Sequence, residues 1–375
     1  MKAMILAAGL GTRLRPLTDI VPKPMVPMAG RPCMEYIIRL LQKHGFDDIM
    51  VNLHYLPEKI TGSFGDGAEF GVKITYSYEE ELLGTADGLK KVEDFFAGEP
   101  VLLVSGDALT DLDLTAFYRY HQKHGAIATL ALKAVADPSQ YGVVMLERER
   151  ITAFQEKPAR NEAISSLANT GIYLFTPDIF ARIPANCFFD FGRQVFPALL
   201  AGGEKMAGYE TSAYWCDVGD LAVYRDANFA LLAGRVQADV PGEDKGGYIR
   251  LGGSVFLARE SVVTGPVFIG DECVVAKGAQ IYGPAVLGKG CRLEKGAVVK
   301  DSILWDHVRV GAGAVVNGCI LADGCEIASG MVLEDEVVVE EMLAGRREAA
   351  AGKAESSRPG PCTGKSRELR SRRGR

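Results

Sequence analysis

CVVAKGAQIYGPAVLGKGCRLEKGAVV, residues 273–299, carries a large apolar residue at every sixth position. The period extends in both directions, and its anchors are Leu251, Leu257, Val263, Ile269, Val275, Ile281, Leu287, Leu293, Val299 and Trp305. The frame then slips by one residue to Val310, slips again to Leu321, and continues through Ile327 and Leu333. A period of six fits neither an isolated helix nor a flat sheet. It predicts a three-sided parallel β-helix with one hexad per face.

A second set of residues supports the same prediction. Most anchors are followed four positions later by a compact or branched residue that would fit beside them in a narrow prism, namely Val255, Ser261, Val267, Cys273, Ala279, Ala285, Cys291, Ala297 and Ile303. The pattern resembles the hexapeptide-repeat domains, which implies a left-handed β-helix. Some proteins with that fold are acyltransferases that use a catalytic His, and His307 is the one His of the repeat region. Because His307 lies at a frame slip, we favour a stacking and homo-oligomerisation module.

Residues 1–233 have a different organisation. Short apolar runs at 3–8, 49–53, 72–76 and 101–104 predict strands, and 34–43, 86–95 and 114–123 between them predict helices. Further strands are expected at 127–132, 143–146, 151–155 and 170–175, and a closing helix at 220–233. This alternation predicts an α/β domain with a Rossmann-like, mostly parallel sheet covered on both faces. We expect a linker at 234–248, the β-helix at 249–340 and a disordered tail at 341–375.

Charge and composition exclude several classes of protein. The net charge is −6, but residues 346–375 carry ten Lys or Arg and three Glu, or +7, which leaves −13 on the other 345 residues. An acidic body argues against a nucleic-acid-binding enzyme, and the basic tail is too poor in large apolar residues to fold alone. No apolar run reaches the roughly 18–20 residues of a membrane span. With no zinc-like spacing among its eight cysteines, the chain is expected in the reducing cytoplasm.

The first chemical motif follows the first predicted strand. A glycine turn at Gly9 and Gly11 is followed by Arg13 and by Lys23, which stands between two prolines. Such a turn can present N–H groups to phosphates, and Arg has a planar fork suited to phosphate oxygens. Neither the dinucleotide-binding pattern nor the P-loop fits, since Leu14 replaces the third glycine and no Gly-Lys-Ser/Thr follows.

The second motif is the apolar run 101–104, which is followed by Ser105, Gly106 and Asp107. An acidic residue there lies at the carboxyl edge of the sheet, where open α/β sheets bind ligands, and a carboxylate suits Mg²⁺. Taken alone, Asp107 fits a strand-ending turn equally well. The neighbouring Asp111 and Asp113 are expected to serve a turn and a helix cap, and Asp220 a second cap.

Together these motifs resemble the signature of the sugar-1-phosphate nucleotidyltransferases over about residues 1–233. The resemblance implies Mg²⁺ held by Asp107 and by Asp217 of Trp-Cys-Asp-Val-Gly, with Arg13, Lys23, Asp107 and Asp217 as catalytic residues. It implies a nucleotide site of Leu6, Ala8, Gly9, Gly11, Thr12, Arg13, Gly84, Thr85 and Asp107. It implies a sugar-phosphate site of Lys23, Gly142, Glu156, Lys157, Asn169 and Gly171.

The implied reaction is in-line attack of a sugar 1-phosphate on the α-phosphorus of a nucleoside triphosphate, with release of pyrophosphate and no covalent enzyme intermediate. The motifs are most similar to bacterial mannose-1-phosphate guanylyltransferases, which implies GTP and mannose 1-phosphate. Glucose 1-phosphate with ATP, dTTP or UTP stays open, because Gly84-Thr85-Ala86 occurs in both groups. A non-catalytic regulatory homologue also stays open, although the four catalytic positions are intact.

Overall fold

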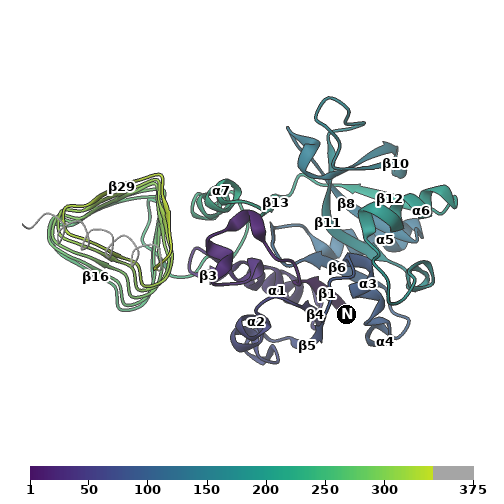
Figure 1. Cartoon of the computed structure of the whole chain (residues 1–375), viewed down its shortest axis with the longest axis horizontal. Helices are drawn as coiled ribbons and strands as arrows, with labels where there is room; N and C mark the ends of the chain where they lie inside the picture. The colour runs from purple at the N-terminus through teal and green to yellow at the C-terminus, as the bar shows by residue number, and fades with distance from the viewer. Residues whose placement is uncertain (341–375) are drawn as a thin grey trace, which may run out of the picture.

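The computed structural model describes residues 1–340, and the predicted tail at 341–375 lies outside the described residues. Two bodies lie side by side in Figure 1, an α/β body and a triangular prism, with the helix α7 (Leu221–Leu232) near their junction. Within residues 1–340 no helix is both long and apolar enough to cross a membrane.

The α/β body is built on a nine-stranded sheet. Its strands, in spatial order, are β5 (Lys73–Tyr78), β4 (Asp48–Leu53), β1 (Lys2–Leu6), β6 (Val101–Ser105), β11 (Leu167–Phe175), β8 (Ala128–Ala134), β12 (Met206–Glu210), β10 (Arg150–Glu156) and β9 (Gly142–Glu147). The first four are mutually parallel, as the Rossmann-like prediction requires. In the other half only β8 and β12 pair in parallel, so the sheet is mixed there.

Both faces of the sheet are covered because successive strand residues point to opposite sides. In β1, Ala3 and Ile5 belong to one buried cluster and Met4 to the other. The helices α1 (Cys33–Lys43), α2 (Pro57–Phe64) and α5 (Leu114–His124) cover the first face, while α3 (Thr85–Lys90), α4 (Glu93–Phe96) and α6 (Phe196–Ala201) cover the second. The helix predicted at 86–95 is therefore two short helices.

Two small strand pairs complete the α/β body. β7 (Ala108–Thr110) pairs with β13 (Trp215–Asp217), and β2 (Pro27–Met28) pairs with β3 (Arg31–Pro32). The 3-10 turns η1 (Thr12–Leu14) and η3 (Lys23–Met25) lie between β1 and β2 and carry Arg13 and Lys23. The two expected caps are confirmed, since Asp113 accepts from the Ala116 N–H and Asp220 from the Val223 N–H.

The prism confirms the three-sided parallel β-helix (Figure 1). One face consists of β14 (Glu243–Asp244), β15 (Ile249–Leu251), β18 (Val267–Ile269), β21 (Ala285–Leu287), β24 (Ile303–Leu304), β27 (Ile320–Leu321) and β30 (Val337–Val338). The second consists of β16 (Phe256–Leu257), β19 (Val274–Val275), β22 (Arg292–Leu293), β25 (Arg309–Val310) and β28 (Glu326–Ile327). The third consists of β17 (Val262–Thr264), β20 (Gln280–Tyr282), β23 (Val298–Lys300), β26 (Val315–Asn317) and β29 (Val332–Glu334).

The prediction of Trp305 as an interior anchor with Ile303 as a compact interior residue is wrong. Leu304 stacks on Leu287 inside the prism, while Ile303 and Trp305 pack outward in a cluster shared with the α/β body. The hexad frame therefore slips between Val299 and Leu304 and not between Trp305 and Val310. Buried Ser302 is the compact residue that fits inside the prism beside Leu304. Sequence alone could not place the slip because residues 303–305 are all apolar.

Candidate functional site

Two strand pairings bring Asp107 and Asp217 together. Asp107 follows β6, whose last residue Ser105 lies beside Leu6 at the end of β1. The chain then forms β7, and its antiparallel register with β13 sets Asp217 opposite Ala108. The Val218 N–H donates to the Asp107 carbonyl at 3.0 Å. The two carboxylates therefore meet at the carboxyl edge of the sheet although 110 residues separate them (217 − 107).

Lys23 joins the two carboxylates. Its Nζ lies 2.9 Å from Asp217 Oδ1 and forms an ion pair with Asp107 Oδ2. The other oxygen of Asp107 accepts from the Ser105 hydroxyl at 2.5 Å, and Arg13 Nη2 stands 3.9 Å from Asp217 Oδ2. The four residues with predicted catalytic roles thus form one charged cluster.

Burial and charge shift the pKa values in this cluster. Burial raises the pKa of Asp217, and the nearby Asp107 carboxylate raises it further. Burial opposes ionisation of Asp107 too, but Lys23 and the Ser105 hydroxyl hold the pKa of Asp107 below its usual value. Although burial acts to lower it, the pKa of Lys23 is raised by the two carboxylates, so Lys23 is charged at neutral pH. With Arg13 beside Asp217, the cluster holds two carboxylates and two cationic side chains, so its formal charges balance.

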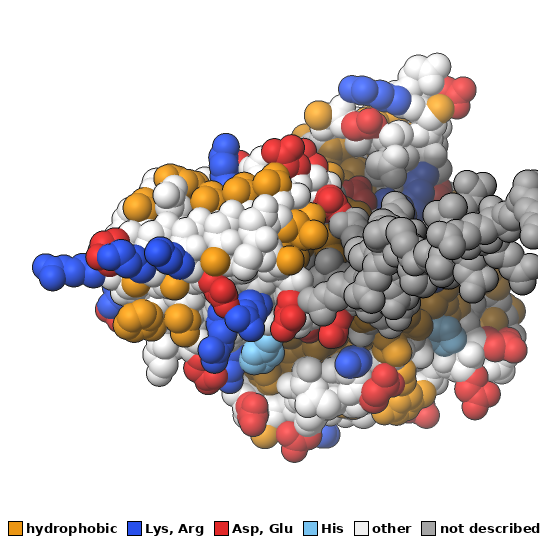
Figure 2. Space-filling model, turned by 60° about the vertical axis from the view of Figure 1, so that its left-hand side comes forward, with side chains coloured by type: hydrophobic (Ala, Val, Ile, Leu, Met, Phe, Trp, Pro, Cys, Tyr) orange, Lys and Arg blue, Asp and Glu red, His pale blue; other side chains and the backbone are white. Residues whose placement is uncertain are grey.

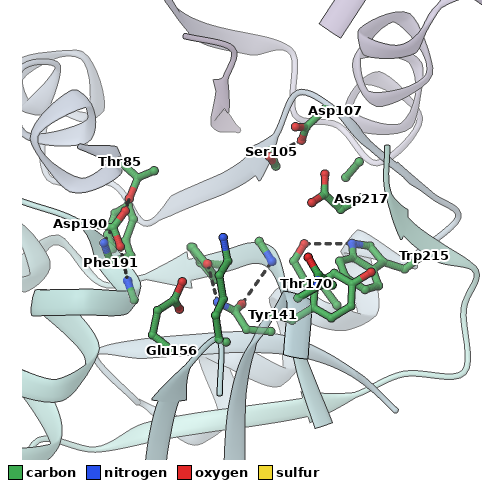
Figure 3. Close-up of a pocket in the computed structure, with 18 residues that line it drawn as sticks. Thr85, Ser105, Asp107, Tyr141, Glu156, Thr170, Asp190, Phe191, Trp215 and Asp217 are labelled. Carbon is green, nitrogen blue, oxygen red and sulfur yellow. Dashed lines mark hydrogen bonds between the residues drawn. The ribbon is translucent and has the colours of Figure 1, made fainter. Parts of the chain in front are cut away.

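A cavity of about 180 Å³ opens beside this cluster (Figure 3). Asp107 and Asp217 stand on one side of it and Glu156 on the other. Its lining includes five of the six predicted sugar-phosphate residues, Gly142, Glu156, Lys157, Asn169 and Gly171. A Cβ at Gly142 would stand 2.6 Å from the Phe154 ring and 2.9 Å from Glu156 Oε2, so only glycine leaves this wall in place.

A second cavity of about 430 Å³ continues from the first. The two share the residues Thr85, Ser105, Asp107, Glu156, Lys157 and Asp190. The predicted nucleotide residues Leu6, Ala8, Gly9, Gly84 and Thr85 line the second cavity. Gly84 has φ +91°, and a Cβ there would stand 2.5 Å from the Phe189 carbonyl oxygen. Asp107 therefore lies where the two cavities meet.

Four predicted residues line neither cavity. These are Arg13 and Lys23, the cationic members of the charged cluster, and Gly11 and Thr12, which lie at the start of the turn η1. Gly11 packs against the side chain of Lys23, because a Cβ at Gly11 would lie 2.8 Å from the Lys23 Cβ. Thr12 begins the turn η1, and Arg13 is half exposed beside Asp217.

Several residues that line the cavities lie outside the sequence motifs. Asn52 and Glu79 lie in the second cavity, where the Asn52 amide donates to Glu79 Oε1 at 2.7 Å and its oxygen accepts from the Ala7 N–H at 2.8 Å. Burial raises the pKa of Glu79. Asp190 accepts from the Thr85 hydroxyl at 2.8 Å, and Arg193 lines the second cavity. Of these residues, only Asn52 could have been expected from the sequence, because it lies in a predicted strand that ends at the edge of the sheet.

The donor set of the cluster fits a divalent cation. Mg²⁺ is usually held by one or two carboxylates, with waters and substrate phosphates completing its shell. Asp107 and Asp217 place two carboxylates, whose oxygens are hard donors, in the wall of the smaller cavity. Among residues 1–340 no group of three or more His, Cys, Asp or Glu side chains is placed to hold a metal ion.

Comparison with known proteins extends these findings. The model of the nucleotidyl transferase family matches residues 2–234, and that of the EIF2B subunit epsilon LbH domain matches residues 247–344. The chain belongs to the sugar nucleotidyltransferase family. Its catalytic body accordingly carries sugar-1-phosphate nucleotidyltransferase activity, and its C-terminal prism is a left-handed β-helix.

Relatives of this transferase differ in base and sugar. It is 38% identical to a UTP–glucose-1-phosphate uridylyltransferase of Synechocystis over 84% of this chain and 85% of the relative. It is 36% identical to a mannose-1-phosphate guanylyltransferase of Mycobacterium tuberculosis over 58% and 60%. A solved structure described as a glucose-1-phosphate thymidylyltransferase from Bacillus anthracis, in complex with a sucrose, superposes with a TM-score of 0.56 at 28% identity, over 61% of this chain and 94% of that one.

Proposed function

We propose that the enzyme transfers a guanylyl group from GTP to mannose 1-phosphate. In this reaction a phosphate oxygen of the sugar attacks the α-phosphorus, a new P–O bond forms, and the bond to pyrophosphate breaks. The smaller cavity would hold the sugar phosphate and the larger one the nucleotide, so that the reacting groups meet beside Asp107. Positioning and charge neutralisation account for the rate, since phosphoryl transfer needs little covalent help from a protein.

The cationic side chains have separate roles in this proposal. Lys23 contacts Asp107, which lies at the cavity junction, and would bind the phosphates at the reacting centre. Arg13, half exposed beside Asp217, would bind the triphosphate and stabilise the departing pyrophosphate. Asp107 and Asp217 would hold Mg²⁺, which supplies positive charge to the phosphate oxygens when bound. With all four residues gathered in one cluster, a catalytic enzyme is favoured over a regulatory homologue.

Glu79 is the observation that favours guanine. It is buried in the wall of the larger cavity, and Asn52 fixes its orientation. A carboxylate only accepts hydrogen bonds when ionised, and the Watson–Crick edge of guanine offers two adjacent donors, N1–H and N2–H₂. Uracil offers a single donor between two acceptors. A carboxylate can therefore accept two hydrogen bonds from guanine but only one from uracil.

A second candidate is uridylyl transfer to glucose 1-phosphate. It is favoured by the Synechocystis relative, whose alignment extends through most of both chains, including the β-helix. The decisive experiment is a matrix of four nucleoside triphosphates against mannose and glucose 1-phosphates, with Mg²⁺ present and pyrophosphate release as the readout. The proposal requires the highest kcat/KM for GTP with mannose 1-phosphate. A maximum for UTP with glucose 1-phosphate would replace it with the second candidate.

We also propose that the β-helix joins copies of this chain. The strands of its third face each present two outward residues, which form a mostly polar column of Thr264, Tyr282, Lys300, Asn317 and Glu334 and, beside it, a second column of Val262, Gln280, Val298, Val315 and Val332. Four of these are valines, and Val332 is 59% exposed. Figure 2 shows hydrophobic side chains gathered between charged ones on the side of the molecule drawn there. An aliphatic column of this kind suits a second copy.

A further inference from the structure

The hairpin β2–β3 connects the catalytic cluster to the β-helix. It begins four residues after Lys23, and its turn contains Ala29 and Gly30, both with positive φ. A Cβ at Gly30 would stand 2.6 Å from the ring of Phe268 in β18, so the turn lies directly against the β-helix. Two-stranded hairpins are marginal without such support. The segment that carries Lys23 therefore depends on what packs around the hairpin.

The hairpin also lacks part of its own hydrogen bonding. Its register sets Pro27 opposite Pro32, and neither residue has a backbone N–H. The Pro27 carbonyl instead accepts from the Tyr224 hydroxyl of α7 at 2.6 Å. Next to it, the Ala29 N–H donates to Asn228 Oδ1 at 2.8 Å. Helix α7 thus supplies the partners that the hairpin cannot supply itself.

Trp305 of the β-helix determines how Tyr224 is oriented. Its indole Nε1 lies 2.9 Å from the Tyr224 hydroxyl, and both side chains are buried. An indole N–H can only donate, so the hydroxyl oxygen must accept from Trp305 and its proton must point to Pro27. The result is a directed chain of two hydrogen bonds from the β-helix to the backbone near Lys23.

The same contact region reaches the other catalytic segments. One buried cluster contains Leu14, which follows Arg13, and Val218, which follows Asp217, together with Trp305 and Phe268. The outer face of the β-helix is therefore part of the support for the catalytic loops.

We propose that Trp305 is a positioning residue for the transfer reaction, acting through Tyr224 and Pro27 to hold Lys23 between Asp107 and Asp217. This inference rests on the proposed role of Lys23 at the reacting centre. It assigns a role in catalysis to the β-helix that is separate from its role in association. Since small displacements of a positioned group carry large rate penalties, the loss of one N–H should be visible in turnover.

The test is a double-mutant cycle in the full-length chain, with pyrophosphate release as readout. Trp305→Phe removes the N–H and keeps an aromatic ring, and it should lower kcat roughly tenfold. In a Lys23→Ala background, followed at high enzyme concentration, the same change should have no further effect, because Trp305 acts through Lys23. Tyr224→Phe should reproduce the behaviour of Trp305→Phe and carries the test if Trp305→Phe fails to fold.

Two controls separate positioning from stability. Ile320→Val trims the same buried contact region without removing a hydrogen bond, and it should keep wild-type turnover. The chain has two tryptophans, and the second, Trp215, lines the proposed sugar cavity. In Trp305→Phe the tryptophan fluorescence therefore comes from Trp215 and reports the binding of mannose 1-phosphate or glucose 1-phosphate separately from turnover. The fluorescence response to sugar phosphate should persist.

The outcomes are distinct. If Lys23→Ala keeps wild-type turnover, the proposed role of Lys23 fails. If Lys23→Ala is impaired but Trp305→Phe turns over at the wild-type rate, or lowers the rate equally in both backgrounds, the positioning role of Trp305 is overturned while that of Lys23 stands.

Discussion

Asp107 is the side chain on which the proposed chemistry depends most, because it contacts Lys23 and lies at the junction of the two cavities. Asp107→Asn keeps its shape but removes a charge that Lys23 and Mg²⁺ both require. We expect turnover to fall by about 10²-fold or more with the fold intact. Asp113→Asn is the matched control, because Asn caps the helix α5 as well as Asp does. Full turnover of Asp107→Asn at saturating Mg²⁺ would disprove the metal assignment.

Glu79 should decide the choice of base. Glu79→Gln replaces an acceptor with an amide that presents both a donor and an acceptor, and so disturbs one of the two pairings with guanine. We expect kcat/KM for GTP, relative to UTP, to fall by about tenfold or more. Glu81→Gln makes the same change of charge at an exposed neighbour and should leave this ratio unaltered. An unchanged ratio in Glu79→Gln would remove the argument for guanine.

The helix α5 should make stability depend on pH. Its buried His121 contacts the Thr129 hydroxyl at 2.7 Å, and burial lowers the pKa of His121 from 6.5 to about 4. Below pH 6.5 the unfolded chain takes up a proton that the folded chain excludes, so stability falls as the pH drops towards 4. The loss should reach about 3 kcal/mol. Urea unfolding at several pH values would measure this loss, and the slope of the free energy of unfolding against pH should be smaller in His121→Gln. An equal slope in both proteins would contradict this account.

The whole molecule combines a catalytic body with a β-helix. In our proposals, one face of the β-helix supports the catalytic loops and another face binds a second copy of the chain. Val315→Glu puts a charge in the middle of the valine column of the third face. We expect the mass measured by light scattering to fall towards that of a single chain. Val274→Glu, on the second face, lies in a column that already contains Arg292, Arg309 and Glu326, so it should leave the mass unchanged. A wild-type protein of monomer mass would refute the proposed association.

Features that depend on local order along the chain follow from the amino-acid sequence alone. The period of six forces a prism because each side has the same length, and the apolar run before Gly106-Asp107 forces a strand whose end lies at the sheet edge. The caps at Asp113 and Asp220 follow from chemistry within one helical turn. Each of these needs only neighbours a few residues apart.

Which distant residues meet depends on the packing of the whole chain. The register of β13 on β7 sets Asp217 beside Asp107, and without the family resemblance no local pattern in the sequence indicates that register. Glu79 and Arg193 line the larger cavity through long-range packing, and Trp305 faces outward rather than inward because a surface of the α/β body buries it there. Local periodicity reports whether a side chain is apolar, whereas its contacts depend on what the rest of the chain places opposite it.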